Sequence, residues 1–326
     1  MGNILITGAT GFIGSLLVRK ILADGMFDAL LLPVRNRDKA ETMYKTVGKN
    51  LSGKLHFAEA SLEELDRMIF PMPVDYIIHC ASVTQSAEMI SHPVETADSI
   101  ILCTRSVLDA ARRLHIKSMV YLSSMEVYGK VRDTGRRRKE DELGELSLES
   151  VRSCYSLGKR VAEHYCHIYQ QEYQIPVKIA RLAQIFGKGI RSDDNRVYMQ
   201  FARAVYEERD IVLKTKGNSI GNYCASEDAV NAIFTILNKG IDGEVYNVVN
   251  ETNTMSVRDM AELVVRQIAG NRIKVQVKIE DSMKTGYAPD TGLRLSGEKL
   301  RQTGWQPTKG LVQMYRDVLS EMEEKL

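Results

Sequence analysis

Short apolar runs of strand length alternate with amphipathic runs of helix length through the first half of this 326-residue chain. Parallel strands need a crossover connection, and a helix is the usual crossover. The alternation therefore predicts an α/β fold built on a doubly wound parallel sheet. The expected strands are 3–7, 29–34, 55–58, 76–79, 118–123 and 177–181, and the helical stretches between them include 13–23 and 88–114.

The pattern changes after about residue 185, where helical stretches become dominant. These helices are expected at 197–208, 225–238, 256–268 and 309–324, with short strands at 243–247 and 274–277. No linker-like stretch separates the two parts. We therefore predict a first domain at 1–185, to which later segments return, and a smaller α/β lobe that is formed mainly by 186–326.

The composition excludes several other classes of protein. Hydrophobic residues make up 44% and charged residues 26%, which is ordinary for a globular chain. No apolar run reaches the length of a membrane-spanning helix, and the net charge of +2 gives no reason to expect nucleic acid or membrane as a partner. Five cysteines without a CxxC pattern argue against a disulfide framework or a zinc site. The N-terminus lacks a secretory signal pattern, so we expect a cytoplasmic protein.

One run of charged residues, 132–142, stands out, with three consecutive arginines at 136–138. Its simplest interpretation is a solvated surface loop. The alternative is a mobile basic flap near an anionic substrate.

The sequence TGATGFIG at 7–14 follows the first expected strand and begins the first expected helix. Gly8 permits a tight turn, Gly11 lets a pyrophosphate approach the backbone, and Gly14 lets the helix pack closely on the sheet. The helix N-terminus presents free N–H groups to phosphates. This context predicts a Rossmann-type dinucleotide site formed by Gly8, Thr10, Gly11, Phe12, Ile13 and Gly14. The alternative is a purely structural glycine turn.

The end of the second strand bears on the choice of cofactor. Proteins that prefer NAD usually place an acidic residue there, which binds the ribose hydroxyls. This chain has Arg35, with Arg37 close by. Guanidinium groups suit a 2′-phosphate, so the sequence favours NADP(H). NAD(H) remains the alternative if both arginines are only solvated.

Two further segments carry chemistry: SSMEVYG at 123–129, which ends the fifth strand, and YSLGK at 155–159, which begins a long helix. Tyr155 and Lys159 lie one turn apart on one helix face. A free phenol, with a pKa of about 10, is a poor base near neutral pH, and a neighbouring ammonium group favours the phenolate. Ser124 is placed to orient the substrate oxygen whose proton Tyr155 would remove. The set predicts hydride transfer between a substrate carbon and a nicotinamide; the alternative is a surface tyrosine and lysine.

These residues resemble the short-chain dehydrogenase/reductase superfamily, in its extended branch, the NAD-dependent epimerase/dehydratase family that modifies nucleotide sugars. The segments that carry the resemblance are TGATGFIG (7–14), HCAS (79–82), SSMEVYG (123–129), YSLGKRVAE (155–163), IARLAQIFG (179–187) and LRQTGWQP (300–307). The region 152–187 is similar to UDP-glucuronate decarboxylases and related dehydratases. The resemblance implies that Ser124, Tyr155 and Lys159 are catalytic. It also implies that Tyr155, Lys159, Ser61, Leu62 and Ala81 contact the cofactor.

The chain departs from the family pattern at several positions. Met125 and Glu126 stand where 4,6-dehydratases have an acid–base pair, and Met125 is unable to donate a proton. Glu126 is a candidate base, or else a structural hydrogen-bonding group. The two arginines that usually hold the diphosphate fall at Gly221 and Tyr287. The candidate substrate-binding residues are Thr84, Ser86, Met125, Gln184, which replaces the usual asparagine, and Arg196, with Arg191, Arg203 and Arg294 as further substitutes.

The expected protein is an NAD(P)-dependent oxidoreductase that acts on a nucleotide-activated sugar through a transient keto intermediate. The net outcome is epimerisation, elimination or decarboxylation. A second possibility is a net NADPH-dependent reductase of a keto-sugar or nucleotide-linked ketose, and a third is a non-catalytic dinucleotide-binding regulator. The resemblance also implies a homodimer that pairs the helices at 88–114 and 152–174. In that region Ile100, Ile101, Val107 and Leu108 fit either the interface or the core.

Overall fold

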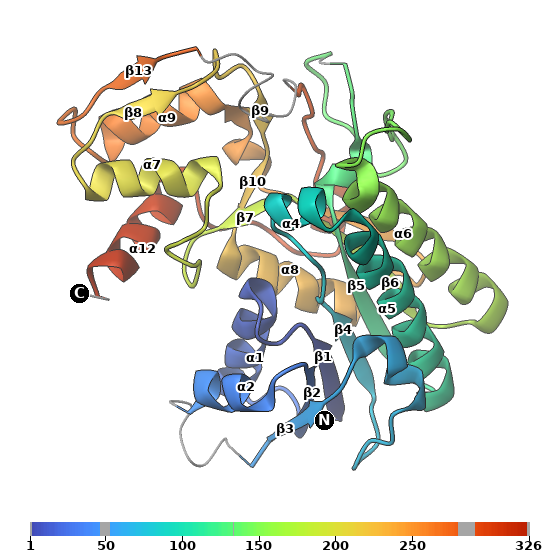
Figure 1. Ribbon diagram of the computed structural model, residues 1–326. Coiled ribbons are helices and arrows are strands. Elements are labelled where there is room, and N and C mark those ends of the chain that lie inside the picture. Colours follow the sequence, from blue (N-terminus) through green and yellow to red (C-terminus); the bar gives the residue numbers. More distant parts are fainter. Residues whose placement is uncertain (1, 46–52, 133, 280–290, 325–326) are drawn as a thin grey trace. The chain divides into compact units, whose positions relative to one another are not determined.

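A computed structural model describes residues 2–45, 53–132, 134–279 and 291–324. The chain forms two compact units (Figure 1). Unit 1 comprises residues 1–129, 146–182 and 230–246. Unit 2 comprises residues 130–145, 183–229 and 247–326. Within the described residues, no helix is long and apolar enough to cross a membrane.

The central sheet has seven strands in the order β11-β6-β5-β4-β1-β2-β3. The neighbouring strands from β6 through β3 are all parallel to one another. Its strands are β1 (Asn3–Thr7), β2 (Ala29–Val34), β3 (Leu55–Glu59), β4 (Tyr76–His79), β5 (Ser118–Ser124), β6 (Val177–Leu182) and β11 (Val245–Val248). The helices that follow the first five of these strands in the chain are α1 (Phe12–Asp24), α2 (Arg37–Tyr44), η1 (Leu62–Arg67), α4 (Ser86–Ser91), α5 (Pro93–Leu114), η2 (Met125–Tyr128) and α6 (Ser153–Tyr173), and α8 (Ser226–Lys239) precedes β11. The predicted doubly wound α/β fold is confirmed.

One helix differs from expectation. The single helix expected at 88–114 is two helices, α4 and α5, which meet at His92. Pro93 lacks an amide hydrogen, so it is unable to continue the hydrogen bonding of α4 but is well suited to the first turn of α5. The proline therefore both ends one helix and begins the next.

Helices α5 and α6 lie side by side over one face of the sheet (Figure 1). Ile100, Val107 and Leu108 are fully buried in the apolar core between these helices and the sheet. Of the two sequence interpretations of these residues, the structure therefore supports the core. Ile101 is half-buried.

A buried ion pair fixes α6 against β6. The guanidinium of Arg181 donates to both carboxylate oxygens of Glu163, at 2.9 Å and 2.7 Å, and also to the hydroxyl of Tyr128 at 3.2 Å. Removing either charge would leave the other buried and unpaired, which is strongly unfavourable. The pair therefore sets the rotation of the helix that carries Tyr155 and Lys159.

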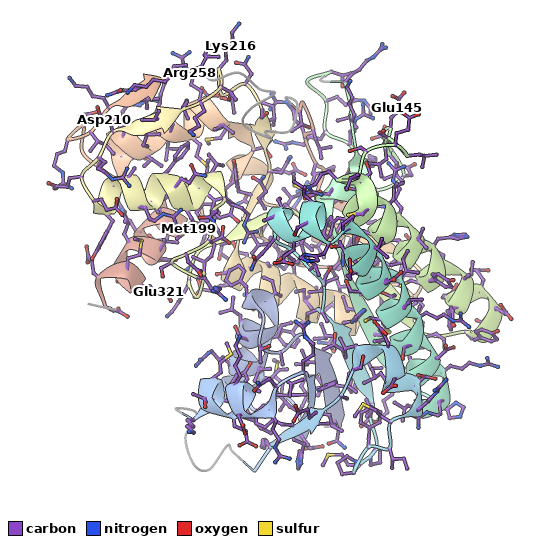
Figure 2. All side chains as sticks on the ribbon, in the orientation of Figure 1. Glu145, Met199, Asp210, Lys216, Arg258 and Glu321 are labelled. Carbon is purple, nitrogen blue, oxygen red and sulfur yellow. The ribbon has the colours of Figure 1, made fainter. Side chains whose placement is uncertain are left out.

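Unit 2 contains three two-stranded pairings: β7 with β10 and β8 with β13 are parallel, and β9 with β12 is antiparallel. Asp210, labelled in Figure 2, precedes β8, and its carboxylate accepts from the Lys274 amide at 2.8 Å and from Gln276 at 2.6 Å. The elements are β7 (Gln184–Phe186), α7 (Val197–Tyr206), β8 (Ile211–Leu213), β9 (Ile220–Gly221), β10 (Tyr223–Ala225), η3 (Glu251–Asn253), β12 (Met255–Ser256), α9 (Val257–Gln267), β13 (Val275–Val277), α11 (Glu298–Gln302) and α12 (Leu311–Glu323).

The charged run at 132–142 is anchored within unit 2. Arg137 forms an ion pair with Glu251 at 3.2 Å and donates to two backbone carbonyls, those of Glu251 at 2.9 Å and Leu295 at 3.3 Å. Arg301 shares the same carboxylate at 2.8 Å. These contacts disfavour the alternative of a mobile basic flap.

Candidate active site

The glycine-rich turn joins β1 to α1 with little space for side chains. Gly8 has a φ of +68°, a left-handed conformation that favours glycine, and a Cβ on it would lie 2.8 Å from the Ala81 amide nitrogen. The Gly11 amide donates to the Gly8 carbonyl at 2.9 Å. A Cβ on Gly14 would overlap that same carbonyl. At each of these glycines, a nearby backbone atom leaves little or no room for a Cβ.

The N-terminus of α1 is suited to bind an anion. Gly11 is the N-cap residue, no side chain caps the helix, and the first turn carries no acidic residue. Gly11 is exposed, and a Cβ on it would contact only the Gly8 carbonyl, at 3.2 Å. Beside it Thr10 is exposed, and Phe12 and Ile13 are half-buried. The turn therefore fits the pyrophosphate of a dinucleotide.

Only one of the two arginines after β2 has a carboxylate partner in the structure. Arg37 forms an ion pair with Glu41 at 2.7 Å, and Asn36 caps α2 by accepting from the Lys39 amide at 2.8 Å. Arg35 is exposed directly after the strand. Arg35 is thus the better placed of the two to meet a ligand at this edge.

The other predicted cofactor and pocket residues lie on segments that follow β3 and β4. Ser61 caps η1 by accepting from the Glu63 amide at 3.4 Å, and Leu62 packs against the apolar core. Ala81 is half-buried just after β4. Thr84 and Ser86 are exposed.

Ser124 and Lys159 are both tied to the end of β5. The Ser124 hydroxyl accepts from the Glu126 amide at 3.2 Å. Lys159 donates through Nζ to the Leu122 carbonyl at 2.8 Å. Tyr155 lies one turn before Lys159 and is almost fully buried, with the Lys159 Nζ 5.9 Å from its ring centroid. The structure thus brings the predicted serine, tyrosine and lysine to one edge of the sheet.

Lys159 is only 3% exposed, and burial lowers the pKa of its amine from 10.5 to about 8. Glu163 opposes this shift because its negative charge favours the charged amine. Lys159 is therefore a buried cation near neutral pH that loses its proton more easily than an exposed lysine.

The carboxylate of Glu126 is held by Arg152, the N-cap residue of α6, and by Ser156 of α6, two residues that the sequence analysis did not identify. Arg152 lies 3.0 Å from it, and the Ser156 hydroxyl donates to it at 3.3 Å. These two residues are four apart on the helix, so their i, i+4 spacing around Tyr155 was the available signal. Met125 is half-buried beside Glu126.

The predicted substrate-binding residues of unit 2 lie on β7 and α7. Gln184 begins β7 opposite Tyr223 of β10, and its Oε1 atom is buried without a hydrogen-bond partner among the described residues. Arg196 is the N-cap residue of α7 and forms an ion pair with Asp194 at 3.0 Å. Gln184 therefore carries an unsatisfied acceptor in this unit.

Two of the remaining arginine candidates, Arg191 and Arg203, are held by local partners. Arg191 pairs with Asp193 at 2.8 Å, and Arg203 donates to the Ser192 carbonyl at 2.7 Å. Arg294 is half-buried. Gly221 lies against the Tyr223 hydroxyl, which fills the place where a side chain at 221 would begin. Tyr287 lies outside the described residues.

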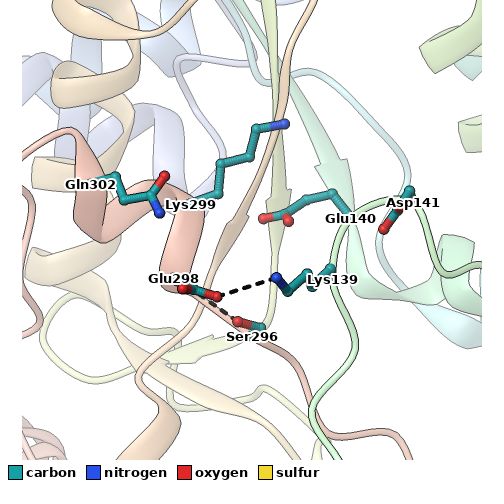
Figure 3. A pocket seen from close by; sticks show the side chains of 7 residues that line it. All are labelled: Lys139, Glu140, Asp141, Ser296, Glu298, Lys299 and Gln302. Atoms are coloured by element: carbon teal, nitrogen blue, oxygen red, sulfur yellow. Dashed lines mark hydrogen bonds and ion pairs between the residues drawn. The ribbon is translucent and has the colours of Figure 1, made fainter.

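Unit 2 also has an open pocket of about 370 Å³ (Figure 3). Lys139 and Glu298 face each other across 3.6 Å, and the Glu298 amide donates to Ser296 at 3.3 Å. Its lining residues are Lys139, Glu140, Asp141, Ser296, Glu298, Lys299 and Gln302. The charges of both signs largely balance, so this lining shows no preference for one ligand charge.

Burial of Lys159 predicts a specific pH dependence of stability. Between about pH 8 and pH 10.5 the unfolded chain binds a proton that folded Lys159 has lost, so folding becomes more favourable as the pH rises. The free energy of unfolding of the wild type, relative to Lys159→Met, should therefore increase across this range. Urea denaturation of both proteins from pH 7 to pH 10.5 measures it; parallel curves would contradict the assignment.

Comparison with known proteins identifies the family. The NAD dependent epimerase/dehydratase family matches residues 4–249. UDP-glucuronic acid decarboxylase 1 of Danio rerio is 26% identical over 84% of this chain, and UDP-glucuronic acid decarboxylase 6 of Arabidopsis thaliana is 27% identical over 99%. The chain spans 62% of the length of the first relative and 88% of the second.

Solved structures show the same fold. UDP-glucuronic acid 4-epimerase from Bacillus cereus, in complex with UDP-glucuronic acid and NAD, superposes with a TM-score of 0.81 at 18% identity and covers 99% of this chain and 100% of its own. RMD from Pseudomonas aeruginosa, complexed with NADPH, gives a TM-score of 0.79 at 23% identity and covers 100% of both chains. The resemblance stated from the sequence is confirmed: this chain belongs to the NAD dependent epimerase/dehydratase family.

Proposed function

We propose that this protein is an NAD(P)-dependent enzyme that acts on a nucleotide-activated sugar. The observation that carries the proposal is that the phosphate-binding helix end and the predicted catalytic residues lie at the same edge of the unit 1 sheet. The uncapped N-terminus of α1 follows β1, and Ser124, Tyr155 and Lys159 gather at the end of β5, with only β4 between these strands. Open α/β sheets bind their ligands at the carboxyl ends of the strands.

The backbone of 8–14 would hold the pyrophosphate, with Ser61, Leu62 and Ala81 along the rest of the cofactor. Lys159 would hold the nicotinamide ribose. The nicotinamide, when bound, supplies the hydride acceptor or donor. The pyrophosphate assignment rests on the close backbone approaches at Gly8 and Gly14 and on the exposed surface at Gly11.

Tyr155 would remove the proton of a sugar hydroxyl while Ser124 donates a hydrogen bond to the same oxygen. The nearby ammonium group of Lys159 favours the phenolate form of a tyrosine. Loss of the hydroxyl proton, together with loss of the hydride on the same carbon to the nicotinamide, would leave a ketone, which would make the hydrogen on the neighbouring carbon more acidic. In epimerisation at that carbon, Glu126, oriented by Arg152 and Ser156, would accept its proton. In decarboxylation a carboxylate on that carbon would leave as carbon dioxide, and no proton would be removed there.

The outcome we favour is epimerisation or decarboxylation. Elimination of water requires a side chain that donates a proton to the leaving hydroxyl, and Met125 has no proton to donate. The relatives include both UDP-glucuronic acid decarboxylases and a dTDP-D-glucose 4,6-dehydratase at 26–27% identity, so the choice rests on Met125. Gln184 and Arg196, in unit 2, and Thr84 and Ser86, in unit 1, are the candidate substrate-binding residues of this proposal. The division of roles between residues 1–185 and 186–326 is part of this proposal, as is a cytoplasmic location.

A panel of UDP-glucose, UDP-glucuronic acid and dTDP-glucose, each with NAD or NADP, tests the activity by product identification. Tyr155→Phe should lower kcat roughly 10²- to 10⁴-fold, because it removes the general base. Tyr165→Phe, on the same helix, is the matched control and should leave kcat unchanged. Full turnover by Tyr155→Phe would overturn the catalytic assignment.

The same assay separates the alternatives. An enzyme that re-reduces its own intermediate causes no net change in nicotinamide absorbance. A net reductase, which Arg35 favours, consumes NADPH stoichiometrically. A non-catalytic regulator binds the dinucleotide and converts none of the substrates.

We also propose that NADP(H) is the preferred dinucleotide. Arg35 is exposed after β2 and suits a 2′-phosphate. Arg35→Ala should weaken NADP binding roughly tenfold, as expected for the loss of a charge-assisted contact, and leave NAD binding nearly unchanged. Arg37→Ala, which removes a residue already paired with Glu41, is the control. Titration calorimetry of both dinucleotides measures the difference; equal losses for NAD and NADP would contradict it.

A homodimer through α5 and α6 is the third part of the proposal. Leu102 of α5 and Val161 of α6 are 43% and 41% exposed, and Ile168 of α6 is 39% exposed. Adjacent helices with apolar outer faces suit a second copy of the chain. Leu102→Glu should shift the protein to a monomer in light scattering at micromolar concentration. Val212 on β8 is equally exposed, at 43%, and Val212→Glu should leave the dimer intact. A wild-type protein that is a monomer would contradict the proposal.

A further inference from the structure

A fully buried histidine joins the glycine-rich turn to helix α5. His79 is the last residue of β4 and is 1% exposed. Its Nδ1 atom lies 2.7 Å from the Thr7 hydroxyl, and its Nε2 atom lies 3.2 Å from the Thr104 hydroxyl. Thr7 is the last residue of β1, directly before Gly8.

The neighbouring carbonyl and amide determine which nitrogen of His79 carries the proton. The Thr104 hydroxyl lies 2.6 Å from the Ile100 carbonyl, which is able only to accept, so Thr104 donates its proton there. Thr104 must then accept from His79, which places the proton on Nε2. His79 Nδ1 is left as an acceptor, and the Thr7 hydroxyl donates to it.

This orientation leaves the Thr7 oxygen to accept from the Ala81 amide, at 3.2 Å. Ala81 is the residue whose amide nitrogen faces Gly8 most closely. The hydrogen bonds therefore run without a break from the α5 carbonyl of Ile100, through Thr104, His79 and Thr7, to the backbone beside the turn.

The same histidine is kept neutral. Burial and the nearby charge of Lys159 lower the pKa of His79 to about 3. Its ring centroid lies 5.6 Å from that of Tyr121, over which the Lys159 Nζ lies at 4.7 Å. Cys80, the next residue, is half-buried, and burial raises the pKa of its thiol, so it adds no charge there. Lys159 remains the cation of this cluster.

We infer that His79 is a positioning residue for the dinucleotide site, acting through the Thr7 hydroxyl on the backbone of Gly8 and Ala81. The neutral Nε2–H tautomer satisfies every contact in the series, whereas the other tautomer would set two lone pairs against each other at Thr104. The inference rests on the proposed binding of a dinucleotide at the glycine-rich turn.

Two substitutions separate the two sides of the ring. Asparagine places its Oδ1 atom near the position of Nδ1, and glutamine places its Nε2 atom near the position of the ring Nε2. His79→Asn should therefore keep the contact to Thr7, and His79→Gln should keep only the contact to Thr104. We expect His79→Gln to raise the Kd for the dinucleotide roughly five- to tenfold and His79→Asn to change it less than threefold, although both lower the Tm.

Thr7 supplies a conservative rescue. Thr7→Ser retains the hydroxyl and should keep the wild-type Kd within about threefold, while the isosteric Thr7→Val should raise it as His79→Gln does. Binding is measured by titration calorimetry with NAD and NADP at a temperature where every variant is folded. The Tm of each variant is measured in parallel, because a merely structural role would move Tm and Kd together.

Nitrogen-15 imidazole spectra of the wild-type protein provide a test that needs no variant. We expect one histidine in the neutral Nε2–H form that does not titrate between pH 5 and pH 8. An Nδ1–H tautomer, or titration of His79 in this range, would overturn the inference. So would equal Kd values for His79→Asn and His79→Gln. A wild-type protein that binds neither dinucleotide would instead overturn the proposed function, while the tautomer result would still stand.

Discussion

The close approach of backbone to backbone at the ends of β1 and β4 is the constraint on which this structure depends. Gly8 leaves no space for a Cβ beside Ala81, and Gly14 leaves none beside the Gly8 carbonyl. Side chains larger than hydrogen would push α1 away from the sheet. The N-terminus of the helix would then no longer face the edge at which Ser124 and Lys159 lie.

The second requirement is that α6 keeps one rotation relative to the sheet. The buried pair of Arg181 and Glu163 links β6 to this helix, and the contact from Lys159 to the Leu122 carbonyl links it to β5. Both contacts bury a charged group, and burying a charge is favourable only when the group is fully hydrogen-bonded or paired with an opposite charge. The burial that positions Lys159 also lowers its pKa, so its placement and its chemistry have one physical cause.

In unit 2, the structure explains one departure from the family pattern. Gly221 has no side chain because the ring of Tyr223 occupies the adjacent space, within an aromatic cluster with Phe186 and Tyr198. Arg191 and Arg196 pair with Asp193 and Asp194 on the same loop. An anionic ligand that used these arginines would have to compete with those carboxylates.

The sequence by itself determined six of the seven strands of the sheet and the order of motifs along it, because hydrophobic periodicity and glycine spacing are local signals. The seventh strand, β11, was expected at 243–247 in the smaller lobe, and only the structure places it in the sheet. The predicted bounds of 3–7, 29–34 and 76–79 match β1, β2 and β4. Local signals also suffice for YxxxK, since one helical turn brings Tyr155 and Lys159 together wherever the helix lies. The break at Pro93 was visible in the sequence, but the apolar pattern continues across it and obscured it.

Only the tertiary structure decided which side chains are buried together. The contacts of Glu126 with Arg152 and Ser156 join segments 26 and 30 residues apart, and those of His79 with Thr7 and Thr104 span 72 and 25 residues. The tautomer of His79 and the lowered pKa of Lys159 depend on such contacts and on burial, which no local pattern encodes. The sequence therefore determined which groups are present, and packing decided their protonation and their partners.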